Sequence, residues 1–227
     1  MNDSSQELVL CKKSFQYFLY TLRSKRNSVR YFGGRYIAST TLLEDENFDK
    51  YSLFQNQIIK PEPLTLIKNH TRQIGFTTFL AFYVYYISYY KPCSNVFWVT
   101  DPKHFSRIGK IISEIGLALQ DVMNCMVTIN APSKELTFSH NSSSIKFLND
   151  TTYEFRSFKE RIDLVVFDSA GLHNYDKLSF FLEGVTMKSI ADRVIMNFDV
   201  GKEKSVEQVK SLEYEFPGFI NIIERIN

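Results

Sequence analysis

The chain has few cysteines, no run long enough to span a membrane and no leader-like start, and each lack excludes a class of protein. Its three cysteines lie far apart in 227 residues, at Cys11, Cys93 and Cys125. They fit neither a disulfide framework nor a zinc site, and they favour a reducing compartment. The first residues, MNDSSQELVL, lack the basic and apolar regions of a secretory signal. The one candidate for a membrane span, residues 76–90, has 15 residues without a charge, whereas a span needs about 20.

The four histidines also lack the spacing of metal ligands; they are His70, His104, His140 and His173. The net charge is only +2, because 27 Lys and Arg are nearly balanced by 25 Asp and Glu, but residues 1–36 hold seven basic and two acidic residues. Within them, RSKRNSVRYFGGRY mixes basic and aromatic residues, which suits contacts to phosphates and stacking on bases. The candidate nucleic-acid-binding residues are Arg23, Lys25, Arg26, Arg30 and Arg35. The alternative is an ordinary solvated face.

The remaining pattern predicts an α/β fold. A composition of 44% hydrophobic and 23% charged residues is typical of a globular protein with a sizeable core. Apolar spacing predicts helices at 6–23, 51–60, 77–90 and 103–120. It predicts strands at 64–70, 95–100, 125–130, 162–168, 193–198 and 218–226. The last of these is expected at a sheet edge, and three further short strands are expected between 135 and 158. Strands alternating with helices indicate a mainly parallel central sheet covered on both faces, a three-layer arrangement. We expect an N-terminal helical and basic segment at 1–50 and an α/β domain at 51–227.

A strand, a tight loop and a helix follow one another around TRQIGFTT, residues 71–78. This order is typical of a phosphate-binding loop, in which backbone N–H groups at a helix N-terminus face the phosphates. The candidate nucleotide-binding residues are Arg72, Gln73, Gly75, Phe76, Thr77 and Thr78. Phe76 occupies the place of the lysine that reaches the β- and γ-phosphates, while Thr77 supplies the hydroxyl that holds magnesium. The alternative is a plain connection between a strand and a helix.

A second element of a nucleotide site lies about 90 residues further along. The apolar strand IDLVVFD ends in Asp168, a candidate Mg²⁺ ligand, and Ser169 follows where a glutamate commonly polarises the attacking water. The alternative for Asp168 is a structural acid at a strand end. Together and in this order, the loop and the acid predict a P-loop NTPase-like fold.

These segments resemble the ATPase (motor) domain of the large terminase subunit of tailed phages. The resemblance runs in register over roughly residues 7–200 and includes ELVLCKKSFQYFLYTL, YSLFQNQI, TRQIGFTT, NVFWVTDPKHFSRIGKIISEI, SSSIKFLNDTTYEFRSF and IDLVVFDSAGL. It implies a role in viral DNA packaging, with ATP and Mg²⁺ as ligands and Gln55 on the adenine. It also implies packaging-motor or capsid partners, DNA, homo- or hetero-oligomers, and a place in the infected cell's cytoplasm or the virion.

The chain departs from this family at the residues that carry the chemistry. Phe76 and Ser169 replace the loop lysine and the catalytic glutamate, and MNFDVG (196–201) replaces the threonine-rich coupling segment. The sequence also ends before the nuclease domain that most members carry, which leaves both a fragment and a shortened paralogue open. Losing an electrostatic group costs about 10²–10³ in rate, and losing a base costs roughly 10²–10⁴. We therefore expect a catalytically degenerate paralogue that acts by binding partners.

Two alternatives to this reading stay open. The first is an active packaging ATPase with a deviant loop, one half of a split terminase, in which Lys68 on the preceding strand or Arg72 serves the phosphates. The second is an unrelated α/β binding scaffold.

Overall fold

The computed structural model describes residues 9–15, 17–18, 62–69, 76–118, 127–131, 133–149, 161–188, 190–218 and 220–225, with the backbone alone at 69, 76, 118, 186–188, 224 and 225. The described strands form one sheet in the order β3-β4-β5-β2-β6-β7-β1-β8. The chain divides into two compact units. One contains the N-terminal residues, α5, α6, β3, β4 and the start of β5; the other contains β1, β2, the end of β5, β6 to β8, α7 and α8.

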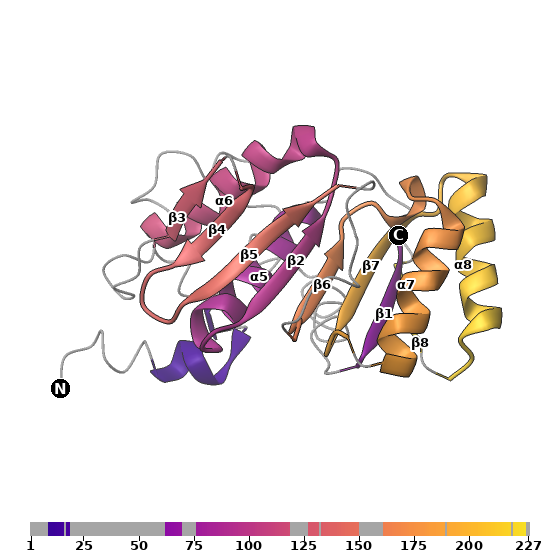
Figure 1. Ribbon diagram of the computed structural model, residues 1–227, viewed down its shortest axis with the longest axis horizontal. Coiled ribbons are helices and arrows are strands. Elements are labelled where there is room, and N and C mark those ends of the chain that lie inside the picture. Colours follow the sequence, from indigo (N-terminus) through magenta and orange to yellow (C-terminus); the bar gives the residue numbers. More distant parts are fainter. Residues whose placement is uncertain are drawn as a thin grey trace, which may run out of the picture. The chain divides into compact units, whose positions relative to one another are not determined.

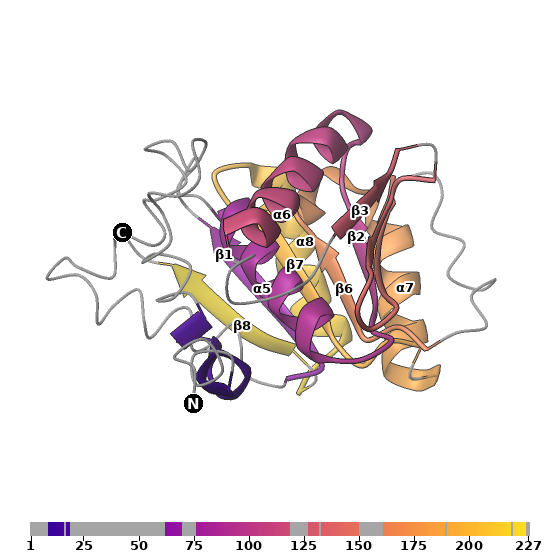
Figure 2. The ribbon, with the colours of Figure 1, turned by 90° about the vertical axis from the view of Figure 1, so that its left-hand side faces the viewer.

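The second unit is built on parallel strands. They are β1 (Leu64–Asn69), β2 (Asn95–Val99), β6 (Leu164–Phe167), β7 (Val194–Asp199) and β8 (Ile220–Arg225). The ladders β2–β6, β6–β7, β7–β1 and β1–β8 are all parallel. Strand β8 therefore ends the described sheet, as expected of residues 218–226, and it lies beside β1 (Figure 2). The runs LVVF and NVFWV are buried throughout, which explains why they are apolar on both faces.

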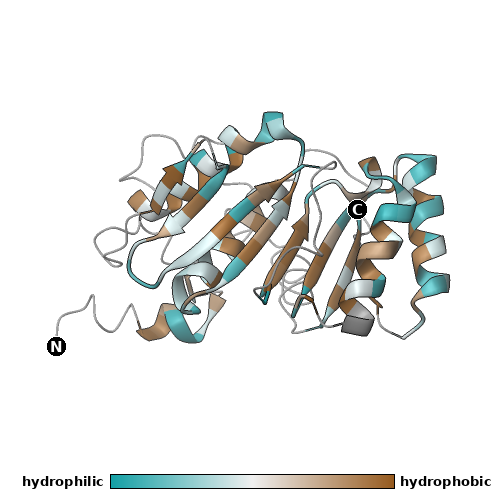
Figure 3. Ribbon diagram, in the orientation of Figure 1, coloured by the Kyte–Doolittle hydropathy of each residue, from teal (hydrophilic) through white to brown (hydrophobic). Residues whose placement is uncertain are grey.

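Two helices and one short turn pack on one face of these strands. They are α7 (Tyr175–Lys188), α8 (Glu203–Glu215) and the 3₁₀ turn η4 (Ala170–Leu172), and the two helices lie side by side (Figure 1). The core under them includes Leu66, Phe167, Met196, Leu182 and Leu212. The strands are mostly apolar along their length, whereas α8 carries many hydrophilic residues (Figure 3). Buried positions on α8 recur at Ser205, Gln208, Val209 and Leu212, which is the spacing of one helix face.

The first unit is organised around α5 (Phe76–Tyr90). Its other elements are η2 (Pro102–His104), α6 (Phe105–Ala118), β3 (Val127–Asn130), β4 (Glu135–Phe138) and the start of β5 (Ser143–Leu148). Every residue of α5 from Thr78 to Tyr85 is buried, and Phe82 is 1% exposed. A helix that is apolar around its whole circumference must be covered on most sides. The expected burial on most faces is confirmed for residues 77–90, all of which are buried or half-buried.

The described N-terminal residues, 9–15, 17 and 18, pack on α5 through aromatic rings. The ring of Phe15 contacts those of Phe79, Tyr83 and Tyr86, with centroids 5.2–5.8 Å apart. The Tyr86 hydroxyl donates a hydrogen bond to the Lys12 carbonyl oxygen over 3.0 Å. Burial raises the pKa of Tyr86, so this donor keeps its proton.

The turn between β4 and β5 closes the C-terminal end of α5. The side-chain amide of Asn141 donates to the carbonyl oxygens of Ser88 and Tyr89, each over 2.8 Å. The hydroxyl of Ser143 donates to the Lys91 carbonyl oxygen over 2.9 Å. Helix ends leave carbonyl groups without intrahelical partners, and these side chains provide them. One turn thus fixes the end of a helix some 50 residues away in sequence.

The expected mixed α/β fold with a mainly parallel sheet is confirmed. The strand expected at 64–70 and the helix expected at 77–90 agree with β1 and α5, while the expected helix 103–120 begins as η2 and continues as α6. The helix expected at 51–60 and the boundary between 50 and 51 lie outside the described residues. Among the described helices, none is both long and apolar enough to cross a membrane.

Candidate functional site

The carboxyl ends of the parallel strands in the second unit bring polar residues to one edge. Strand β6 runs into Asp168, and the register Phe167↔Met196 places Asp168 level with Asn197 of β7. Strands β7 and β1 end together, with Asp199 opposite Asn69. In open parallel sheets, ligands bind outside the carboxyl ends of the strands. This edge is therefore where the fold offers a binding site.

Strand alternation assigns the polar residues to one face of the sheet. Val165, Phe167, Met196 and Phe198 face the core formed with α7 and α8. Side chains of successive strand residues point to opposite faces. The polar residues at positions 168, 197 and 199 consequently share the face away from that core.

Asp168 is held by hydrogen bonds of its backbone to the two neighbouring strands, β7 and β2. It is only 5% exposed, and its carbonyl oxygen accepts a hydrogen bond from the Asn197 side-chain amide over 2.9 Å. Its own N–H donates to the Val99 carbonyl oxygen over 3.4 Å. We call residues 168–173 the acid turn. Asn197 is the residue that sequence reasoning missed, although a polar side chain inside the apolar run RVIMNF was a visible signal.

Ser169 follows Asp168 and precedes η4, and its side chain makes no capping hydrogen bond. A serine hydroxyl has a far higher pKa than a carboxyl group and does not act as a general base unaided. The acid turn therefore carries one carboxylate, that of Asp168.

Lys68 is engaged away from the Asp168 face. Its ammonium nitrogen lies 2.8 Å from a carboxylate oxygen of Glu213 on α8, and both side chains are partly buried. Lys68 follows Leu66 by two positions, so it points to the α8 face of the sheet. This geometry favours a structural ion pair over the phosphate-binding role that the sequence left open for Lys68.

The other predicted nucleotide-site residues are only partly described. Gln55, Arg72, Gln73 and Gly75 lie outside the described residues, as do the basic residues Arg23, Lys25, Arg26, Arg30 and Arg35. Phe76 is the first residue of α5. Thr77 is half-buried and Thr78 is 1% exposed. Phe76, Thr77 and Thr78 belong to the first unit and Asp168 to the second, so the nucleotide site as a whole stays a prediction.

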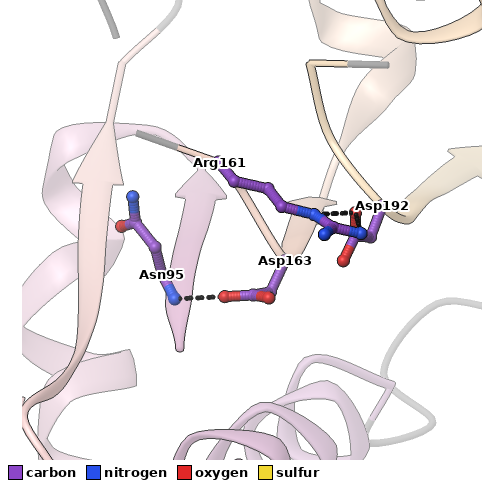
Figure 4. A network of polar contacts seen from close by, with 4 residues as sticks. All are labelled: Asn95, Arg161, Asp163 and Asp192. Atoms are coloured by element: carbon purple, nitrogen blue, oxygen red, sulfur yellow. Dashed lines mark hydrogen bonds and ion pairs between the residues drawn. The ribbon is translucent and has the colours of Figure 1, made fainter. Parts of the chain in front are cut away.

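The opposite edge of the same strands holds a separate polar network (Figure 4). Arg161 donates to a carboxylate oxygen of Asp192 over 2.6 Å, and the Asn95 N–H donates to the Asp163 carboxylate over 2.6 Å. The Arg161 side chain is 75% exposed, so its ion pair contributes little to stability. The described residues contain no group of three or more His, Cys, Asp or Glu that could hold a metal ion. We interpret this edge as structural.

Comparison with known proteins gives a likeness of fold. No protein-family model matches the chain, and no curated protein matches its sequence. The chain is similar to the large terminase of a thermophilic bacteriophage solved in complex with ADP, with 12% identity and a TM-score of 0.51, over 75% of this chain and 43% of that one. It also matches the large terminase ATPase domain of Thermus phage P74-26, with 11% identity and a TM-score of 0.48, over 66% and 68% of the two chains. The match to the ADP complex spans less than half of that chain, and at 12% identity it shows a likeness of fold alone.

Proposed function

We propose that this chain is a terminase-like domain of a phage DNA-packaging system that does not hydrolyse ATP and acts by binding protein, DNA or capsid partners. The observation that carries the proposal is the acid turn. It keeps Asp168 at the carboxyl edge of the sheet, buried and tied to Asn197 through its carbonyl oxygen, and has Ser169 next to it.

Hydrolysis needs two groups that this chain replaces. An incoming water must lose a proton to a base, and Ser169 supplies none. Negative charge on the β- and γ-phosphates must be met by a cation, and the loop offers Phe76 instead. Lys68, on the strand that precedes the loop in the sequence, is paired with Glu213 over 2.8 Å. These features together support the proposal that the domain does not hydrolyse ATP.

The chain keeps oxygen ligands of the type that Mg²⁺ prefers, the hydroxyl of Thr77 and the carboxylate of Asp168. In a retained nucleotide site these two would hold the metal ion of Mg-ATP, which would neutralise phosphate charge. Gln55 would contact the adenine, and backbone N–H groups near Arg72, Gln73, Gly75 and Thr78 would face the phosphates.

The second candidate function is an active packaging ATPase whose nuclease is a separate chain. The observation in its favour is the strand order β6-β7-β1, which keeps the acid-bearing strand and the loop-bearing strand parallel with one strand between them. In that case Arg72 would take the place of the loop lysine.

Calorimetric titration with a non-hydrolysable ATP analogue and Mg²⁺, together with fluorescence anisotropy on a labelled duplex at several salt concentrations, tests the first proposal. We expect nucleotide affinity that is weak or lost and DNA affinity that falls as salt rises, because phosphate contacts release counterions. The matched variant replaces Arg23, Lys25 and Arg26 together by alanine. Its DNA affinity should depend less steeply on salt concentration. Tight, Mg²⁺-dependent nucleotide binding that is lost in Asp168→Asn would contradict the proposal and favour the active enzyme.

A further inference from the structure

Helix α8 contacts the acid turn through side chains that are almost completely buried. The Gln208 side-chain amide donates to the His173 carbonyl oxygen over 2.9 Å, and Gln208 is 4% exposed. One turn earlier, Ser205 lies directly against Gly171, where any larger residue would meet it. A buried polar side chain that crosses to a backbone carbonyl is costly to leave unpaired, so this contact is firm.

The same helix contacts β1 through an ion pair. Glu213 lies five residues beyond Gln208 on α8, and its carboxylate is 2.8 Å from the Lys68 ammonium group. Lys68 is the last residue but one of β1, the strand that leads toward the loop-like stretch 71–78. Between these two contacts, Val209 and Leu212 are buried in the core under the helix.

The two contacts are joined by a rigid element. Five residues of α-helix span about 7.5 Å, and the helical hydrogen bonds keep this length fixed. A second tie runs within the sheet, because Asn197 of β7 donates to the Asp168 carbonyl oxygen and β7 pairs with β1 along six residues. The acid turn is therefore held from two sides by elements that also contact β1.

We propose that α8 is a brace that couples the carboxyl end of β1 to the acid turn, with Lys68, Glu213 and Gln208 as positioning residues. A ligand or partner that displaces the end of β1 then changes how readily residues 168–173 open. Conversely, a change at the acid turn alters the local stability of β1. This coupling goes beyond the proposed function, because it concerns the free protein whether or not it binds nucleotide.

Amide hydrogen exchange on the full chain tests the brace. The probes in the acid turn are the amides of Leu172 and His173, which are hydrogen-bonded to Ser169 and Ala170. In Lys68→Met we expect these amides to exchange about tenfold faster, since one lost charged hydrogen bond corresponds to about this factor. Arg161→Met is the matched control, because it removes an exposed ion pair at the other edge of the same unit; it should leave both probes unchanged.

The reciprocal variant makes the test specific to coupling. Gln208→Met keeps the side-chain length and removes the amide, so we expect faster exchange in β1 as well as in the acid turn. Glu213→Gln removes the charge of the other ion-pair partner without changing the apolar core. It should also accelerate exchange of the Leu172 and His173 amides, as expected for Lys68→Met. Exchange that accelerates only beside each substitution, with no effect at the other contact, would overturn the proposal.

Discussion

Phe82 is the residue whose burial bears most directly on the core of the first unit. It is 1% exposed in the middle of α5, and removing its ring leaves a cavity that the close-packed neighbours fill only in part. We expect Phe82→Ala to lower the free energy of unfolding by about 3–5 kcal/mol. Urea unfolding followed by circular dichroism measures this change.

Leu117→Ala is the control for that variant, because Leu117 is 62% exposed on α6 of the same unit. Its effect should stay within about 0.5 kcal/mol. An unchanged urea midpoint for Phe82→Ala would show that α5 is exposed, and would point to a surface for a membrane or a partner instead.

Gly171 offers a test of the acid turn itself. A Cβ atom at this position would overlap the Ser205 hydroxyl and lie 3.0 Å from the Ser205 Cβ atom. Overpacking of this kind typically costs about 1–3 kcal/mol, so Gly171→Ala should lower the unfolding free energy by that amount. Ser205→Ala in the same chain should recover part of the loss, and chemical denaturation of the single and double variants measures both effects. Equal stability of Gly171→Ala and the unsubstituted protein would mean that η4 does not pack on α8.

Sequence reasoning reached some of these residues and not others. Asp168 could be located because an apolar run ending in an acid is a local pattern. The partners that define its surroundings, Asn197 and Gln208, come from elements 29 and 35 residues from their contacts. Such pairings depend on the order of strands in the sheet, which no single segment encodes.

At the scale of elements, the turn at residues 139–142 matters because it fixes the end of α5. Asn141→Ala removes the amide that donates to Ser88 and Tyr89. We expect a loss of about 1–2 kcal/mol in unfolding free energy and faster amide exchange in the last turn of α5, because the freed carbonyl groups must find water.

Ser133→Ala is the comparison for this variant, since Ser133 makes only exposed contacts in the turn between β3 and β4. It should leave exchange in α5 unchanged. If both variants behave alike, the β4–β5 turn does not close the helix.

Elements with long apolar runs were predictable, whereas α7 and α8 were not assigned. Strands such as LVVF are buried on both faces, so their composition alone indicates them. Helix α8 has only a narrow buried stripe among charged residues, and α7 has Gly184 within it. Their identity as helices depends on packing against the sheet more than on local preference.

At the scale of the whole molecule, alternating segments and the order of two weak motifs were enough to predict a mainly parallel P-loop-like sheet. The position of β7 between β6 and β1 could not be predicted, because it reflects the way that crossovers return to the sheet. The likeness to the ADP-bound terminase structure supports the fold. The proposed loss of hydrolysis depends mainly on Phe76 and Ser169, the residues at the two motif positions.

The central claim is that this motor-like fold does not hydrolyse ATP. Release of inorganic phosphate by the full chain with ATP and Mg²⁺, in the presence and absence of duplex DNA, tests it most directly. We expect no turnover above background, and none in Phe76→Lys, because Ser169 still leaves the attacking water without a base. Turnover by the unsubstituted chain that is abolished in Asp168→Asn would contradict the claim.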